Sequence, residues 1–275
     1  MKLKSIFIIF NVLVVISFLF VFFLPAFFLG WDYTAVFWGD NWYLAVLFLA
    51  VLAILNVYFG RNWRLFTALE HEDWDAVISV MERRVFGRGP VRQGNVRLLI
   101  NAYVVTNRTG KVGELELHLR EHAPKVLQRS ALLFGIPHLL SNNGEEMAAY
   151  YGEFLETGSR RDREWIRWNY AFALMLQQRL DEAREILLEL ARETKPGLLQ
   201  ALSAYLLDAY QDGATKEIVG QSRSAIQSAL SRREWQKRVD DERSELHILV
   251  LSKLLRDVEE WLYGDAAERG NTAGE

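Results

Sequence analysis

A glycine recurs at an almost constant interval in the second half of this chain. The positions lie 34, 34 and 35 residues apart, and they are Gly110, Gly144, Gln178 (which replaces one glycine) and Gly213. Five residues after each position stands an apolar residue that would face a neighbouring helix: Leu115, Ala149, Ala183 and Ile218. Repeats of this length are typical of stacked helical hairpins. The sequence therefore predicts that these glycines form the turns between paired helices.

Two long apolar runs precede the repeats and cannot belong to them. The first, at residues 6–29, is long enough for a helix to cross a bilayer, and it exceeds the apolar core of about 7 to 15 residues in a signal peptide. The second, at residues 42–59, has aromatic and arginine residues at its ends, as at a membrane interface. These runs predict a transmembrane hairpin over residues 1–60. A cleaved signal peptide is the alternative for the first run, and a buried helix of a soluble domain for the second.

Charges around the two runs predict how the hairpin lies in the membrane. The intervening residues 31–41 form a short predicted loop that contains two aspartates and no cation. The outer ends carry Lys2, Lys4, Arg61 and Arg64. Because basic residues favour the cytoplasmic side, we expect both termini in the cytoplasm and the protein in a bacterial inner (plasma) membrane.

The rest of the chain has the apolar pattern of an all-α domain. Apolar residues follow the helical period, without a long strand-like alternation. We expect a helical solenoid over residues 61–263 that ends in a capping helix at about 234–262, and a disordered tail at residues 264–275. A coiled-coil contact with another subunit is the alternative for the last helix. Residues 61–275 carry 30 basic and 33 acidic residues, which argues against nucleic-acid binding. The absence of cysteine excludes disulfides and thiolate metal sites.

One segment, residues 165–196, resembles a tetratricopeptide repeat (TPR). It reads WIRWNYAFALMLQQRLDEAREILLELARETKP. Ala171 and Ala183 occupy small positions where the paired helices touch, and Leu187 occupies a large apolar position one turn later. The resemblance implies a TPR-like α-solenoid whose first helices form a concave surface for another protein or peptide. The other units keep only the period and the turn glycine.

An additional repeat around Ala76 would precede these units. Its first helix would be the cytoplasmic end of the second membrane helix, at about residues 61–70, which would hold the solenoid rigidly at the bilayer. A flexible tether at Gly60 is the alternative.

The partner-binding residues follow from the register of the clear repeat. This register implies a groove formed by Ile100, Asn107, Arg108, Phe134, His138, Asn142, Trp165, Trp168, Phe172 and Met175. Trp165 and Trp168 are expected to hold an apolar side chain of the partner. Their alternative role is to fill the core between repeats.

Five arginines close to the second apolar run are expected to contact anionic lipid headgroups. They are Arg61, Arg64, Arg83, Arg84 and Arg88. Each basic residue near such a surface contributes about 1 kcal/mol to membrane binding. A solvated, positively charged loop is the alternative.

One short motif could belong to an enzyme. His118, Glu121 and His122 match the H-x-x-E-H pattern of inverted zinc peptidases, but short patterns match often by chance and no third ligand is evident. A zinc-dependent peptidase is therefore a remote alternative. Neither a phosphate-binding glycine loop nor a nucleophile elbow is present, so we expect no enzymatic activity and no cofactor.

Together these features predict a membrane-anchored scaffold for protein–protein interaction. The alternative is a structural subunit of a larger membrane complex, for transport, motility or envelope assembly. In that complex Asn11, Ser17 and Asn56 would contact other membrane helices.

Overall fold

The computed structural model describes residues 3–159, 162–210, 212–243 and 245–271. Over these residues the chain is helical and contains no strand, which confirms the predicted all-α class. It divides into two compact units, residues 1–83 and 84–275.

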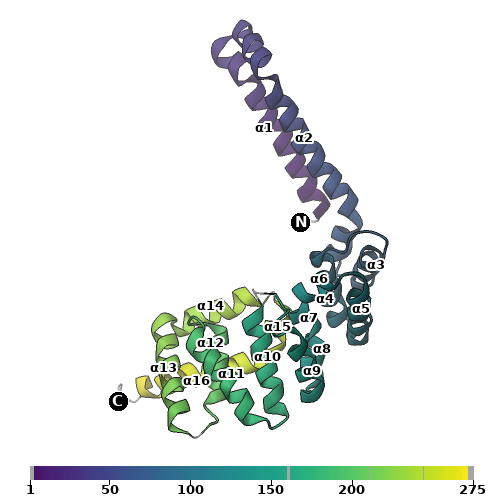
Figure 1. Cartoon of the computed structure of the whole chain (residues 1–275). Coiled ribbons are helices and arrows are strands. Elements are labelled where there is room, and N and C mark those ends of the chain that lie inside the picture. Colours follow the sequence, from purple (N-terminus) through teal and green to yellow (C-terminus); the bar gives the residue numbers. More distant parts are fainter. Residues whose placement is uncertain (1–2, 160–161, 211, 244, 272–275) are drawn as a thin grey trace. The chain divides into compact units, whose positions relative to one another are not determined.

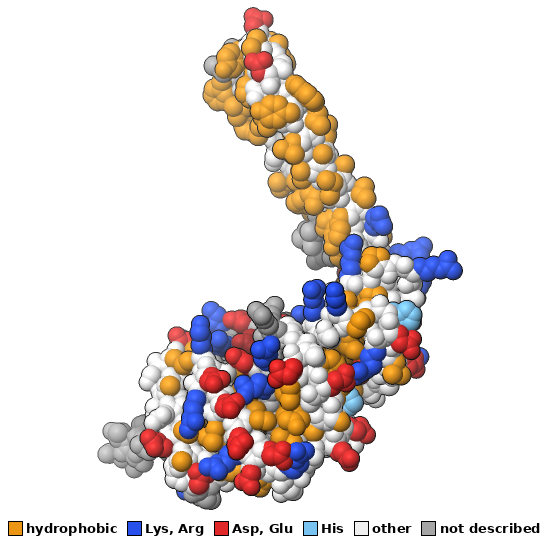
Figure 2. All heavy atoms as spheres, viewed as in Figure 1, with side chains coloured by type: hydrophobic (Ala, Val, Ile, Leu, Met, Phe, Trp, Pro, Cys, Tyr) orange, Lys and Arg blue, Asp and Glu red, His pale blue; other side chains and the backbone are white. Residues whose placement is uncertain are grey.

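The first unit begins with a helical hairpin. Helix α1 (Leu3–Leu29) is followed by Gly30, whose φ of 87° lies in the left-handed region that glycine adopts without strain. Helix α2 (Trp31–Glu70) then returns alongside α1 (Figure 1). Aromatic rings pack between the two helices, with Phe18 and Phe48 stacked at a centroid distance of 4.0 Å. Apolar side chains cover the outer surface of the hairpin (Figure 2). Both helices are long and apolar enough to cross a membrane.

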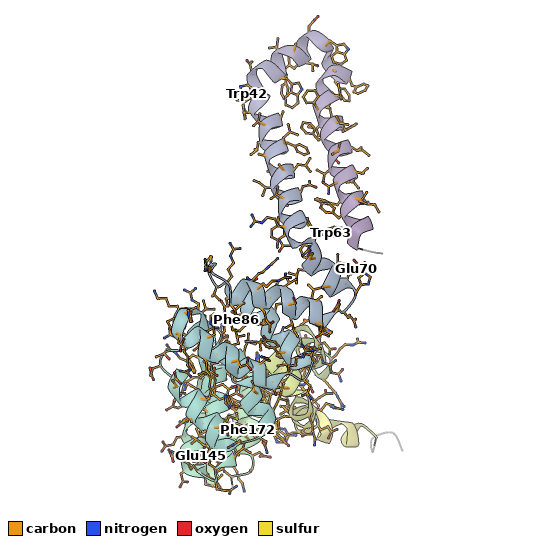
Figure 3. All side chains as sticks on the ribbon, turned by 90° about the vertical axis from the view of Figure 1, so that its right-hand side faces the viewer. Trp42, Trp63, Glu70, Phe86, Glu145 and Phe172 are labelled. Carbon is orange, nitrogen blue, oxygen red and sulfur yellow. The ribbon has the colours of Figure 1, made fainter. Side chains whose placement is uncertain are left out.

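The predicted loop at residues 31–41 is wrong, because these residues belong to α2. The chain reverses through Gly30, a short helical stretch and a kink at Asn41, so the residues between them can pair their backbone groups within a helix. The helix is interrupted only at Asn41, where φ is −117° and ψ is 23°. It then continues past residue 59, the predicted end, through Gly60 to Glu70. A glycine inside a helix costs only about 1 kcal/mol relative to alanine. Figure 3 shows Trp42 and Trp63 on this long part of α2.

A backbone feature recurs along the chain with nearly the predicted period. Among the described residues, four that are not glycine have a positive φ, and they lie 35, 35 and 36 residues apart: Glu72, Asn107, Asn142 and Gln178. Two residues after each of them begins a helix, namely α3 (Trp74–Val85), α5 (Thr109–His122), α9 (Gly144–Phe154) and α11 (Leu180–Glu193). The left-handed residue therefore marks the turn between paired helices.

The recurring glycines do not form these turns, so that part of the prediction is wrong. Gly110, Gly144 and Gly213 lie within the first two residues of α5, α9 and α13 (Gly213–Ala229), and none has a positive φ. The predicted helix-facing positions are confirmed in part: Leu115, Ala183 and Ile218 are buried, whereas Ala149 is exposed. The residue five positions after each left-handed residue is at most 1% exposed: Val77, Val112, Met147 and Ala183.

In the second unit, neighbouring helices pack in sequence order. Its remaining elements are α4 (Gln93–Val105), α6 (Pro124–Arg129), α7 (Ala131–Phe134), α8 (Ile136–Ser141), α10 (Arg163–Leu176) and α12 (Leu198–Leu207). Each of α9 to α12 packs against the helix that follows it, α10 also contacts α12, and α11 contacts α13. Within this run, α10 thus lies beside α12, and α11 lies beside α13.

The predicted single capping helix at 234–262 is divided into three. These are α14 (Arg232–Glu242), α15 (Leu246–Val250) and α16 (Ser252–Asn271). Helix α14 packs against α16, α15 contacts α7 and α8, and α16 contacts α12 and α13. The C-terminal segment therefore packs against earlier helices of the same unit.

The predicted disordered tail differs from the structure in part. Helix α16 continues past Gly264 to Asn271, through alanine, glutamate and arginine residues that favour helices. Residues 272–275 of that tail lie outside the described residues.

Candidate functional site

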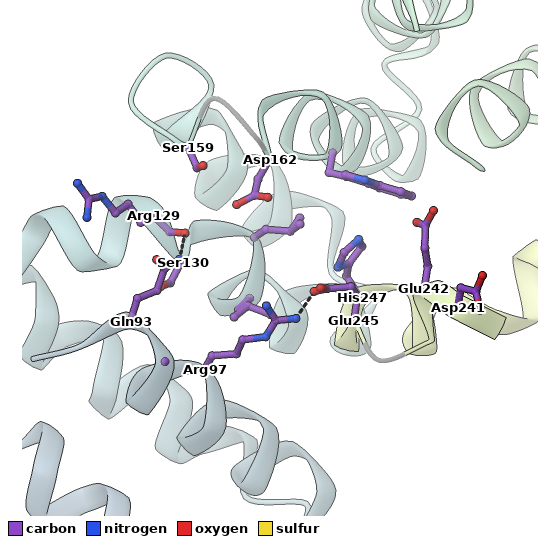
Figure 4. Close-up of a pocket in the computed structure, with 14 residues that line it drawn as sticks. Gln93, Arg97, Arg129, Ser130, Ser159, Asp162, Asp241, Glu242, Glu245 and His247 are labelled. Atoms are coloured by element: carbon purple, nitrogen blue, oxygen red, sulfur yellow. Dashed lines mark hydrogen bonds and ion pairs between the residues drawn. The ribbon is translucent and has the colours of Figure 1, made fainter. Parts of the chain in front are cut away.

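A polar cavity of about 900 Å³ lies within the second unit (Figure 4). Its wall comes from segments far apart in the sequence: Gln93, Gly94, Arg97, Arg129, Ser130, Leu132, Leu133, Ser159, Asp162, Trp165, Asp241, Glu242, Glu245 and His247. The turn between α14 and α15 brings the last four of these residues to α4, α7 and α10. The cavity therefore exists because the C-terminal segment folds back.

Two contacts hold the rim of the cavity. The side-chain amide of Gln93 on α4 donates a hydrogen bond to the backbone carbonyl of Arg129, with an N–O distance of 2.8 Å. The guanidinium of Arg97 forms an ion pair with the carboxylate of Glu245, directly before α15. Hydrogen bonding to this carboxylate raises the pKa of Arg97 above its usual value. The ion pair joins the start of the unit to its C-terminal segment.

His247 is the most unusual group in the wall. It is 6% exposed and its ring packs edge-on against Trp165, with 4.8 Å between ring centroids. Neither ring nitrogen has a hydrogen-bond partner among the described residues, and the hydroxyl of Ser130 also lacks one. Burial lowers the pKa of His247 to about 4, so the imidazole is neutral at pH 7.

Unpartnered buried polar groups are uncommon and each costs about 1–3 kcal/mol. A neutral imidazole can donate one hydrogen bond and accept another, and a serine hydroxyl can do both. Arg129 and Asp241 place opposite charges on the same wall. The cavity is therefore suited to a ligand that carries both donors and acceptors.

The structure separates the predicted groove residues. Ile100, Phe134 and Trp168 are at most 1% exposed and belong to the core, so the prediction of a surface groove is wrong for them. Trp168 stacks on Phe172 with 5.4 Å between centroids, as expected for its alternative role in the core. Of all ten residues, only Trp165 lines the cavity.

The other predicted groove residues lie away from the cavity. Asn107 and Asn142 are the left-handed turn residues, a conformation that asparagine tolerates well, and Arg108 is exposed beside the first of them. His138 stacks on Tyr150 with 4.9 Å between centroids. Phe172 and Met175 are half-buried on α10.

Sequence reasoning missed the residues that distinguish the cavity, namely Arg97, Ser130, Glu245 and His247. Glu245 and His247 fall inside the predicted capping helix, where nothing marks them as part of a site. The lysine, arginine and glutamate residues before them favour a helix and therefore conceal the break.

The H-x-x-E-H residues lie on the surface near the end of α5. The rings of His118 and His122 stack with 4.4 Å between centroids, and Nδ1 of His122 lies 3.0 Å from the carbonyl oxygen of His118. The part of the chain that the structure describes contains no group of three or more His, Asp or Glu side chains that could hold a metal ion. The structure therefore adds no support to the alternative that this protein is a zinc-dependent peptidase.

The predicted lipid-contacting arginines fall on both units. Arg61 and Arg64 lie on α2, and Arg83 lies near the end of α3 in the first unit. Arg84 and Arg88 belong to the second unit. Arg61, Arg64, Arg83 and Arg88 are exposed, while Arg84 is half-buried.

Fold and site together define an all-helical protein with two apolar N-terminal helices and a helical domain that contains a polar cavity. The chain belongs to the family described as "Uncharacterised Treponema protein", whose model matches residues 111–264. It is also similar to an "Uncharacterized protein" of Treponema pallidum (strain Nichols), with 25% identity over 232 residues that cover 79% of this chain and 74% of that protein. No solved structure matches the chain. The family that matches is not described as a TPR family, so the TPR resemblance stays a prediction.

Proposed function

We propose that this protein is a membrane-anchored scaffold that binds another protein through a TPR-like helical domain. The recurring left-handed turn residues, at intervals of 35, 35 and 36, support the solenoid. The contacts between alternate helices support it as well.

The hairpin is the proposed membrane anchor, with both termini in the cytoplasm of a bacterial cell. Asp32 and Asp40 lie in the first part of α2, between Gly30 and the kink at Asn41, and Arg61 and Arg64 lie toward its other end. Basic residues remain on the cytoplasmic side of an inner membrane. This charge distribution supports a cytoplasmic helical domain.

The cavity with its buried, unpartnered His247 is the observation that carries the proposed binding site. An extended peptide has amide donors and carbonyl acceptors at every residue, and such groups can satisfy His247 and Ser130. Trp165 provides an aromatic wall for a side chain of the same peptide. The partner in this proposal is therefore a peptide segment of another protein.

Site-specific photo-crosslinking in native membranes tests this function. The crosslinking residue replaces Asp241, an exposed residue in the cavity wall, and in the control it replaces Leu117 on α5, which is 66% exposed and outside the wall. We expect an adduct from Asp241 that is absent from Leu117 and weakened by His247→Leu, which keeps the side chain's volume and removes its nitrogens. Equal adducts at both positions, or no effect of His247→Leu, would contradict the proposal.

A subunit of a larger membrane complex is the second candidate, and the structure weakens one argument for it. The side-chain amide of Asn56 donates a hydrogen bond to the side-chain oxygen of Asn11, with an N–O distance of 2.8 Å. These asparagines thus pair within the hairpin. A crosslinker at Val46, which is 52% exposed on α2, provides the test. Adducts from Val46 with none from Asp241 would favour the membrane complex.

A further inference from the structure

A second groove, whose wall combines apolar residues with two arginines, lies entirely within the first unit, where α2 meets α3. Its volume is about 410 Å³. From α2 the wall includes Trp63, Arg64 and Thr67, and from α3 it includes Ser79 and Arg83. The turn at residues 71–73 joins the two helices, and the wall combines residues from the end of α2 with residues along α3.

The groove lies at the depth of lipid headgroups if the hairpin spans the membrane. Arg64 follows Phe59, the last residue of the apolar run, by five positions, which is about 7.5 Å along a helix. The headgroup layer on each side of a bilayer is about 5–8 Å thick. Trp63 packs edge-on against Phe7 of α1 with 6.1 Å between centroids, and tryptophan is enriched at this depth.

The charges in the groove favour an anion. Arg64 and Arg83 are both exposed, and neither is paired with a carboxylate among the described residues. The Nε of Arg83 donates to the carbonyl of Ser79, with an N–O distance of 3.1 Å, which orients the guanidinium. Asp73 is an acidic residue in this wall, and its carboxylate accepts a hydrogen bond from the backbone N–H of Ala76 at 3.0 Å.

We propose that this groove binds the phosphate headgroup of an anionic phospholipid. Two guanidiniums from different helices can hold a phosphate through paired hydrogen bonds, and the hydroxyls of Thr67 and Ser79 supply further donors. The lipid's acyl chains would lie along the apolar surface of the hairpin. The inference rests on the proposed membrane span. It assigns lipid binding to one defined groove, whereas the sequence alone predicted only that five arginines attract anionic headgroups.

Native mass spectrometry of the full-length protein in detergent tests the site with phosphatidylglycerol as the probe. Phosphatidylcholine and inorganic phosphate serve as comparison ligands. The double variant Arg64→Gln/Arg83→Gln should weaken phosphatidylglycerol binding about tenfold or more, because it removes two charge-assisted contacts. The matched control Arg61→Gln/Arg88→Gln removes the same charge outside the groove wall and should leave binding within about twofold of the unaltered protein.

Three results would overturn this inference. An equal loss in both double variants would indicate attraction by net charge alone. Equally tight binding of inorganic phosphate would identify a soluble anion as the ligand, and equally tight binding of phosphatidylcholine would exclude selectivity for an anionic headgroup. Alkaline extraction of membranes tests the anchor separately. A protein that stays in the membrane but binds no phosphatidylglycerol contradicts the lipid site alone, whereas release into the extract contradicts the anchor itself.

Discussion

The substitution Gly144→Ala tests why a glycine stands at the start of α9. A Cβ atom at this position would lie 2.8 Å from Cβ of Leu176 and 3.0 Å from the backbone carbonyl oxygen of Ala173, both on α10. Ordinary contacts between carbon atoms are about 3.5–4.0 Å long. Neither neighbour is the flexible end of a side chain, so α9 and α10 must move apart.

The expected cost follows from this overpacking. Inserting a methyl group into a packed interface costs about 1–3 kcal/mol. A helical domain of this size loses about 2–4 °C in Tm for each kcal/mol, so we expect Tm to fall by about 2–12 °C. The separation would also lengthen the hydrogen bond from the side-chain amide of Gln177 to the carbonyl of Gly144, whose N–O distance is 2.6 Å.

The chain supplies matched controls at equivalent positions of other repeats. A Cβ at Gly110 or Gly213 would meet no atom within 4 Å. Alanine there reduces only the entropy of the unfolded chain and should stabilise the protein by about 0.4–1 kcal/mol. Thermal unfolding of the full-length protein in one detergent, followed by circular dichroism, compares the three variants. Equal Tm values for Gly144→Ala and Gly110→Ala would refute the argument from close helix packing.

Three further predictions concern buried and paired groups. As pH falls from about 6.5 to 4, His247 gains a proton in the unfolded state but not in the folded state, so the free energy of unfolding should fall by up to about 3 kcal/mol. Measurements of Tm against pH should show that His247→Gln lacks this loss of stability and that His122→Gln, at an exposed position, retains it. Trp168→Ala removes a fully buried ring and should cost about 3–5 kcal/mol in denaturant unfolding, and a cost below about 1 kcal/mol would contradict its place in the core. Asn56→Leu removes the hydrogen bond to Asn11 and should destabilise the hairpin by about 0.5–2 kcal/mol, measured by steric trapping in bicelles, whereas an unchanged value would indicate that the pair contributes no stability.

The sequence determined the helical class, the two apolar N-terminal helices and the repeat interval. These features depend on local patterns: continuous apolar residues, the helical period and a recurring spacing. The wrong turn assignment still gave intervals of 34, 34 and 35 residues, close to the 35, 35 and 36 between the left-handed residues, because Gly144 stands two residues after Asn142. The close approach of α10 explains why Gly144 is a glycine, and no local sequence pattern predicts that contact.

The predicted groove is the clearest example of a feature that local sequence patterns do not determine. The register placed Trp165 and Trp168 on one helical face, and the structure leaves one in a cavity wall and the other in the core.

Only the tertiary structure decided the candidate site. Arg97 and Glu245 are 148 residues apart, and they meet because the chain breaks between α14 and α15 and turns back. The same turn buries His247 against Trp165. A sequence pattern records which residues favour a helix, but burial and pairing depend on which distant helices share a volume, and that is set by the packing of the whole unit.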